Sequence, residues 1–162
     1  MRQRVQRGFT LVELLVSFSI IVVLSTIFLE RIFFYQEQAE RAAFNAVLNA
    51  MQTGLRLQHA MILIREGPKG LAEIGDINPV DVLLEPPPNY FGGLSEASSP
   101  RNGWYFDRAN KLLIYRPNFH RWLTVSSGGD EIRFRVVVSG NGAGGIRLLP
   151  VEEYLWTQPA VN

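Results

Sequence analysis

The longest apolar segment of the chain lies near its N-terminus. Between Phe9 and Leu29, a stretch of 21 residues, Glu13 is the single charged residue. A helix of that length is about 31 Å long at 1.5 Å per residue, and the hydrocarbon core of a bilayer is about 30 Å thick. Residues 9–29 are therefore predicted to form a transmembrane helix.

The helical pattern continues beyond the apolar segment. Residues 30–66 contain no proline and one glycine, and they are rich in good helix formers. Small and apolar residues recur there at steps of three and four, which traces one helix face: Ala39, Ala43, Ala46, Ala50, Gly54, Leu57, Met61 and Ile64. We expect residues 30–66 to be an exported amphipathic half of the same helix, with this small-residue stripe packed against the rest of the domain.

The pattern changes after Gly67-Pro68, which ends the helix. Residues 67–102 are predicted to be a connecting αβ region in which Asn78 caps a short helix. In residues 103–162 the apolar period falls to two, which is typical of a sheet. Strands are expected at 104–106, 111–116, 132–138 and 146–149, with 154–156 as a further edge and a glycine-rich turn at 140–145. The predicted fold class is α+β, a small antiparallel sheet packed on a long N-terminal α-helix.

Charge and composition add orientation and compartment. The length of 162 residues fits one modest domain plus an anchor. Arg2, Arg4 and Arg7 precede the apolar segment without an acid, so the positive-inside rule places the N-terminus in the cytoplasm and the rest outside. Removing these three charges from the formal net charge of +1 leaves −2. The chain has no cysteine, so packing alone must hold the exported part.

A short motif stands where the basic leader meets the apolar segment, Gly8-Phe9-Thr10-Leu11-Val12-Glu13. It resembles the processing signal of type IV pilins and of the pseudopilins of type II secretion. The resemblance implies that a membrane peptidase removes the leader, residues 1–8, by cutting between Gly8 and Phe9, and then N-methylates Phe9. It also implies that Glu13, the fifth residue of the mature chain, guides filament assembly.

The physical chemistry of Glu13 agrees with that role. An acid within a membrane segment costs about 2.5–3.5 kcal/mol on insertion scales, so it needs a partner. Cleavage would create an α-amine at Phe9, with a reference pKa of about 8. Glu13 pairs with this amine either within one chain, since the two residues are four apart on a helix, or between axially offset subunits. The residues leave both cases open, and the resemblance favours the second.

The resemblance also implies a biological role. The chain is expected to be a non-enzymatic structural subunit of a type IV pilus-like or type II secretion pseudopilus filament. Its expected location is the inner membrane, crossed once, with the C-terminal domain in the periplasm or in a filament. The expected partners are other pilin or pseudopilin subunits, the prepilin peptidase and methyltransferase, an inner-membrane assembly platform and membrane lipid. The choice between pilus and pseudopilus, and between major and minor subunit, stays open.

A basic start and an apolar stretch also occur in secretory signal peptides and in ordinary membrane anchors. A signal peptide carries its cleavage site after the apolar stretch, with small residues, whereas Glu30-Arg31-Ile32 follows the stretch here. A single-pass anchor with a periplasmic binding domain that does not polymerise accounts for the apolar segment. That alternative leaves Glu13 without a purpose.

Candidate catalytic and metal-binding residues are sparse. His59 and His120 are the two histidines, and without cysteine they show no ligand or nucleophile spacing. Asp130 and Glu131 follow a Ser-Ser-Gly-Gly segment, which raises the question of a calcium loop. Calcium prefers about six to eight oxygen ligands, so we expect a hairpin turn at this position and no cofactor.

Basic residues in the sheet region alternate with aromatic residues, an arrangement that suits single-stranded nucleic acid. The basic residues are Arg108, Lys111, Arg116, Arg121, Arg133, Arg135 and Arg147, and the aromatic residues are Trp104, Tyr115, Phe119 and Trp122. However, residues 65–162 hold ten Lys/Arg and eleven Asp/Glu, so they create no net basic field. We therefore expect solvated strand faces and no nucleic-acid partner.

Overall fold

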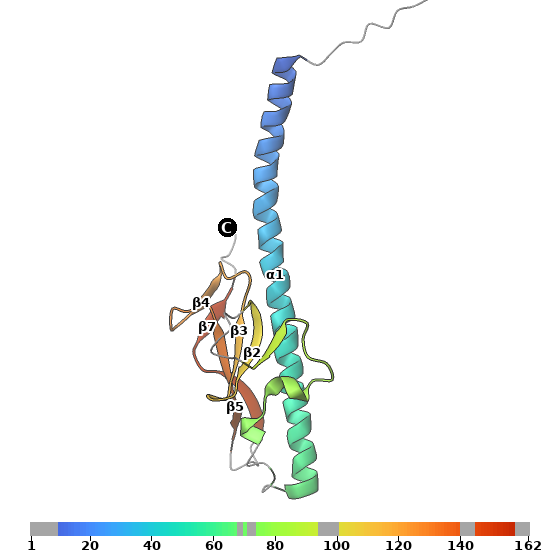
Figure 1. The fold of residues 1–162 in the computed structure, drawn as a ribbon, viewed down its shortest axis with the longest axis vertical. Helices are drawn as coiled ribbons and strands as arrows, with labels where there is room; N and C mark the ends of the chain where they lie inside the picture. The colour runs from blue at the N-terminus through green and yellow to red at the C-terminus, as the bar shows by residue number, and fades with distance from the viewer. Residues whose placement is uncertain (1–9, 68–69, 71–73, 94–100, 140–144, 158–162) are drawn as a thin grey trace, which may run out of the picture. The chain divides into compact units, whose positions relative to one another are not determined.

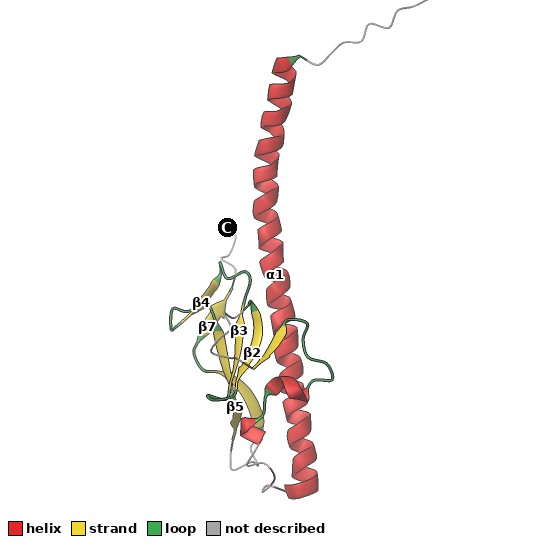
Figure 2. Ribbon diagram, in the orientation of Figure 1, coloured by secondary structure: helices red, strands yellow, loops and turns green. Residues whose placement is uncertain are grey.

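The computed structural model describes residues 10–67, 70, 74–93, 101–139 and 145–157. Contacts divide the chain into two units, residues 1–38 and 39–162, and the helix α1 (Leu11–Glu66) contributes to both. Figure 1 shows the course of the chain and Figure 2 its secondary structure. The helix ends at Glu66 and is followed by Gly67 with φ 69°, a left-handed conformation that suits glycine after a helix C-terminus.

The second unit contains a five-stranded sheet with the order β1-β2-β3-β5-β6. The strands are β1 (Tyr90–Gly93), β2 (Gly103–Asp107), β3 (Leu112–Arg116), β5 (Ile132–Val138) and β6 (Ile146–Pro150). Three of the four pairings are antiparallel, and β1 pairs with β2 in parallel. The long N-terminal helix on a mostly antiparallel sheet confirms the predicted α+β fold class.

The β2–β3 hairpin shows how the local sequence determines the register. The Asp107 carboxylate accepts hydrogen bonds from the backbone N–H groups of Ala109 and Asn110 and from the Asn110 side chain. Lys111 then takes φ 55°, so that Gly103 to Asp107 pair with Arg116 to Leu112. The side-chain hydrogen bond from Asn110, followed by the backbone bonds, lowers the pKa of Asp107. The strands predicted at 104–106 and 111–116 are confirmed, and they form this hairpin.

Two strands, β7 and β1, differ from the sequence-based expectations. Tyr154–Trp156 (β7) does not extend the main sheet but pairs with β4 (Leu123–Val125) in a separate two-stranded sheet. The connecting region contains the strand β1, which pairs with β2 in parallel. The predicted short helix with Asn78 as its N-cap is confirmed as a 3-10 helix, η3 (Pro79–Val82), in which the Asn78 side chain accepts a hydrogen bond from the N–H of Val80. A preceding 3-10 turn, η2, spans Ile74–Asp76. In the predicted glycine-rich turn, residues 140–144 lie outside the described residues.

The core lies between one face of the sheet and the part of α1 that belongs to the second unit. Phe44 is its centre, with ring centroids 4.8 Å from Tyr115 and 5.4 Å from both Trp104 and Trp156. Met51 and Leu55 lie further along the same helix face and are fully buried. Burial of large aromatic side chains supplies most of the favourable free energy of such a core.

The predicted small-residue stripe does not face the sheet, and this expectation was wrong. Ala39, Ala43, Ala46 and Ala50 are exposed, and the exposed fractions of Leu57, Met61 and Ile64 are 62%, 50% and 85%. The space between helix and sheet needs large side chains, which Phe44, Met51 and Leu55 provide. Gly54 lies at the border, where a Cβ atom would stand 2.6 Å from Cγ2 of Val82.

Two polar side chains of α1 fasten the helix to the sheet region. The Glu40 carboxylate accepts hydrogen bonds from Tyr115 Oη (3.0 Å), from the Asn118 backbone and side chain (2.7 and 3.0 Å) and from Phe119 N (2.9 Å). The Gln52 amide binds two backbone groups of β6. Burial, followed by the charge of Glu40 and its hydrogen bond, raises the pKa of Tyr115 strongly.

Candidate processing and assembly site

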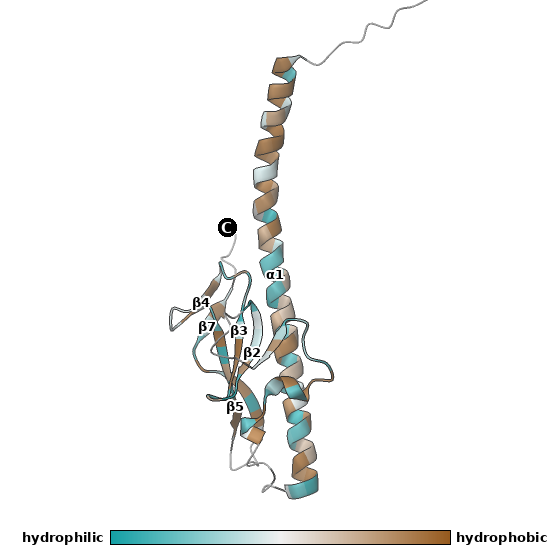
Figure 3. Ribbon diagram, in the orientation of Figure 1, coloured by the Kyte–Doolittle hydropathy of each residue, from teal (hydrophilic) through white to brown (hydrophobic). Residues whose placement is uncertain are grey.

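The N-terminal part of α1 exposes an apolar surface all round. The exposed fractions are 80% for Leu11, 54% for Ile20 and 67% for Phe28. An 18-residue window of this helix has a mean hydropathy of 2.5 and is 0% buried, and Figure 3 shows the apolar colouring along these turns. The length and composition of this helix are those of a single-pass membrane anchor.

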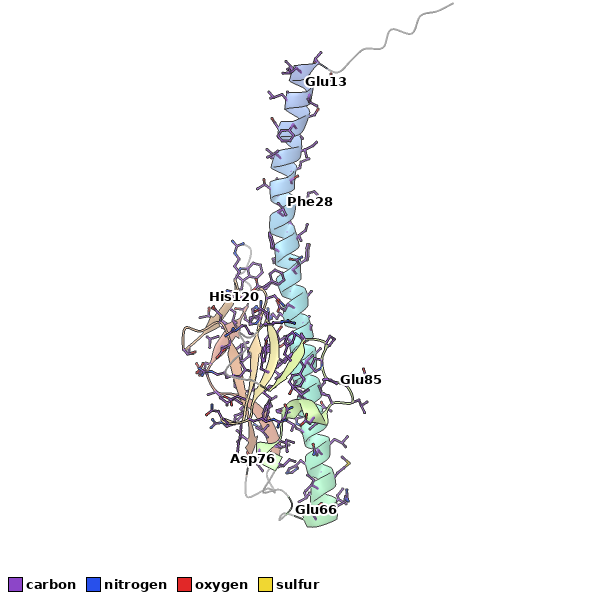
Figure 4. All side chains as sticks on the ribbon, viewed as in Figure 1. Glu13, Phe28, Glu66, Asp76, Glu85 and His120 are labelled. Atoms are coloured by element: carbon purple, nitrogen blue, oxygen red, sulfur yellow. The ribbon has the colours of Figure 1, made fainter. Side chains whose placement is uncertain are left out.

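Glu13 lies in the first turn of this helix (Figure 4). Its side chain is exposed, and among the described residues none forms an ion pair with it. The N-terminus of a helix carries a partial positive charge, which stabilises an acid in the first turn. The Glu13 carboxylate thus lies on an apolar surface, where the helix dipole compensates part of its negative charge. Because the side chain is exposed, a cationic partner can reach it.

Thr10 precedes the first helical residue and closes the first turn. Its side-chain oxygen accepts a hydrogen bond from the backbone N–H of Glu13 (3.3 Å), and its carbonyl accepts one from the N–H of Leu14 (3.1 Å). These contacts are those of a helix N-cap, whose side chain satisfies one of the free donors of the first turn. Sequence reasoning placed Thr10 in the motif and missed this role, although Thr-x-x-Glu is a capping signature.

The proposed cleavage site, Gly8 and Phe9, lies outside the described residues. Its place in the chain relates it to the rest of the site: Phe9 is followed directly by the capping Thr10, and Glu13 is the third residue of α1. The cleavage, the N-methylation of Phe9 and the assembly role of Glu13 therefore stay predictions.

The candidate residues for metal or catalytic chemistry do not form a common site in the described part of the chain. His59 is buried in α1, whereas His120 is exposed beside β4. Asp130 and Glu131 line a groove of about 630 Å³ with Arg116 and Arg133. Glu131 forms an ion pair with Arg116 (3.2 Å), and the structure shows no group of three or more potential metal ligands among the described residues.

The strand arginines on the outer side of the sheet are partly neutralised. Besides the pair between Arg116 and Glu131, Arg133 binds the Glu152 carboxylate, which also accepts a hydrogen bond from Ser127 (2.6 Å). Of the aromatic residues interleaved with them, Trp104 and Tyr115 are buried in the core. They are not available as stacking platforms for bases, which single-strand binding requires.

Residues 3–29 match the family model described as the prokaryotic N-terminal methylation motif. This range contains two of the three leader arginines, Arg4 and Arg7, together with the Gly8-Phe9 junction, Glu13 and the apolar segment. Searches of curated proteins and of solved structures returned no match.

The motif and the fold agree with each other, and the motif implies processing by a prepilin peptidase. Members of the pilin family are in general structural proteins without enzymatic activity. The chain therefore carries the N-terminal methylation motif of the type IV pilin and pseudopilin family, on a pilin-like α+β fold.

Proposed function

We propose that the chain is a structural subunit of a type IV pilus-like or type II secretion pseudopilus filament, which assembles through its N-terminal helix. The observation that carries this proposal is an acid, Glu13, in the first turn of an apolar helix whose large side chains are exposed. A membrane anchor alone has no use for Glu13, whereas a subunit that packs its helix against other helices can pair this carboxylate with an amine.

The proposed partner of the Glu13 carboxylate is the Phe9 amine of an axially offset neighbouring subunit. The resemblance to pilins favours this choice over a pair within one chain. The exposed position of Glu13 in the first turn of α1 leaves it accessible to an adjacent helix. Phe9 itself lies outside the described residues.

The exposed small-residue stripe supports assembly independently. Its alanines allow another helix to approach closely, and its C-terminal end adds Leu57, Met61 and Ile64 to the contact. A monomer would leave this surface in water. In a filament, helices that pack side by side would bury this stripe. The exposure of the stripe in the single chain therefore supports contacts with neighbouring subunits.

The proposed division of the chain follows from this role. Residues 1–8 are the leader, 9–29 the transmembrane helix and 30–66 the exported half of the helix, with 67–102 and 103–162 as the connecting and sheet regions. Before assembly, the subunit lies in the inner membrane with its N-terminus in the cytoplasm. Other subunits, the peptidase and methyltransferase, the assembly platform and lipid are its partners.

The mass of the intact chain, purified from membranes of peptidase-positive cells, tests the processing step. We expect a chain that begins at Phe9 and carries one methyl group on its α-amine. Gly8→Leu should yield the full-length, unmethylated precursor. A wild-type chain that still begins at Met1 contradicts the proposal.

A further inference from the structure

The first turn of α1 contains a hydrogen bond between a side chain and the backbone. The Thr10 hydroxyl oxygen accepts the hydrogen bond of the Glu13 backbone N–H at 3.3 Å. Removing this acceptor leaves one more free N–H group among the unpaired donors of the first turn, which destabilises the helix N-terminus.

The same contact controls where the Glu13 carboxylate lies. With Thr10 as N-cap, Glu13 is the third residue of the helix, and its side chain leaves a turn that two hydrogen bonds to Thr10 close. Without the cap the first turn frays, because its free donors have no partner. A frayed turn no longer holds the carboxylate at a fixed height and direction on the helix.

We propose that Thr10 is a positioning residue for assembly: its side chain caps α1 and thereby presents the Glu13 carboxylate to its partner in a neighbouring subunit. This inference rests on the proposed function. It assigns to Thr10 a role that acts entirely through Glu13, and it predicts that hydroxyl chemistry, not side-chain shape, is what the position requires.

The test compares three variants of the full-length chain in cells that make filaments. Thr10→Val keeps the shape of threonine and removes the capping oxygen, whereas Thr10→Ser keeps the oxygen. Thr26→Val is the matched control, because the Thr26 hydroxyl donates to the Val22 carbonyl (3.0 Å) within the same apolar helix but caps nothing. Each variant is scored by intact mass, by membrane level and by its share in sheared filaments.

We expect Thr10→Val to be processed and inserted normally but to enter filaments about fivefold less than wild type, which corresponds to about 1 kcal/mol, the usual loss for an N-cap. Thr10→Ser and Thr26→Val should stay near wild type. In a Glu13→Val background, Thr10→Val should cause no further loss, since its effect passes through Glu13.

Three outcomes overturn the inference. The first is that Thr10→Val enters filaments as well as wild type. The second is that Thr10→Val accumulates as an uncleaved precursor, which would place Thr10 in peptidase recognition. The third is that Thr10→Val causes an additional loss of incorporation in the Glu13→Val background. Failure of the proposed function looks different, because Glu13→Val itself would then enter filaments as well as wild type, or no filaments would contain the chain.

Discussion

The Gln52 side chain forms hydrogen bonds with the backbone at Leu148 as a neighbouring β-strand would. Its Oε1 atom accepts the backbone N–H of Leu148 at 2.7 Å, and its Nε2 atom donates to the carbonyl of Ile146 at 3.1 Å. Because β6 is an edge of the five-stranded sheet, these groups would otherwise be open to another strand. Pro150, at the end of β6, has no N–H group to offer. The helix and the proline together close this edge.

Gln52→Met should therefore destabilise the exported fragment, which lacks residues 1–33. The substitution keeps the length of the side chain but leaves the N–H of Leu148 and the carbonyl of Ile146 without partners. We expect a loss of about 1–3 kcal/mol in the free energy of unfolding, measured by urea denaturation. Asn49→Leu, at an exposed position one turn earlier, is the control and should change stability by less than about 0.5 kcal/mol. Equal effects of the two substitutions would refute the bridging role.

The Glu40 carboxylate offers a second test of how the helix is fastened. Glu40→Gln replaces one acceptor oxygen by an NH₂ group that faces the donors of the loop at Asn118 and Phe119. We expect a loss of about 1–3 kcal/mol in the free energy of unfolding. A double-mutant cycle with Tyr115→Phe should show coupling, since Tyr115 donates to the same carboxylate. Strict additivity of the two substitutions would argue against a shared network.

The buried tyrosines predict how stability depends on alkaline pH. Burial raises the pKa of Tyr115 and of Tyr154, and Glu40 adds to the shift of Tyr115. The folded state thus keeps the neutral phenol when the unfolded chain begins to ionise, near its ordinary pKa of about 10. The stabilisation is complete below that pH and is lost as the pH rises above it.

Thermal unfolding of the exported fragment between about pH 8 and 12 measures this loss. Tyr115→Phe should be less stable than wild type at pH 8, because the hydrogen bond to Glu40 is gone. Its melting temperature should fall less steeply above about pH 10, since one titrating phenol has been removed. An unchanged alkaline slope would mean that Tyr115 ionises as freely in the folded state as in the unfolded chain.

Added side-chain volume should affect stability differently at Ala46, on the exposed stripe of α1, and at Gly54, beside Val82. Ala46→Arg places a long side chain on the exposed stripe and should change the stability of the exported fragment by less than about 0.5 kcal/mol. Gly54→Ala places a Cβ atom 2.6 Å from Val82 Cγ2 and 3.0 Å from the Val82 carbonyl oxygen. We expect it to destabilise the fragment by about 1–3 kcal/mol, despite the better helix propensity of alanine. Reversed results would place the sheet against the stripe.

Local sequence patterns predicted the helix, its C-terminal end and the antiparallel strand pairs, because each depends on period, capping or turn chemistry within a few residues. The buried helix face was missed because polar residues interrupt it. Glu40 and Gln52 lie beside Phe44 and Met51, and their partners are the loop at Asn118 and strand β6. The stripe of alanines has the more regular period, but regularity does not show which face the sheet covers.

The pairings of β1 and β7 could not be predicted from local sequence patterns, because the paired strands are not joined by a short turn. Tyr90 pairs with Trp104 in parallel, and Leu123 pairs with Trp156, which lies far along the chain beyond β5 and β6. No turn between such partners sets their register, so only the packed core decides it. The N-terminal motif, in contrast, could be identified from the sequence alone, since its glycine, phenylalanine and glutamate occur at fixed short spacings.

We expect Glu13 to serve assembly and not anchoring, and co-purification with sheared filaments tests this role most directly. Glu13→Val is compared with wild type and with Ser17→Val, a control one turn further along the same helix. Valine is favourable in a membrane, so the membrane level of Glu13→Val should match wild type, while its share in filaments falls at least tenfold, or about 1.4 kcal/mol. Equal shares of wild type and Glu13→Val in the filaments would contradict the account.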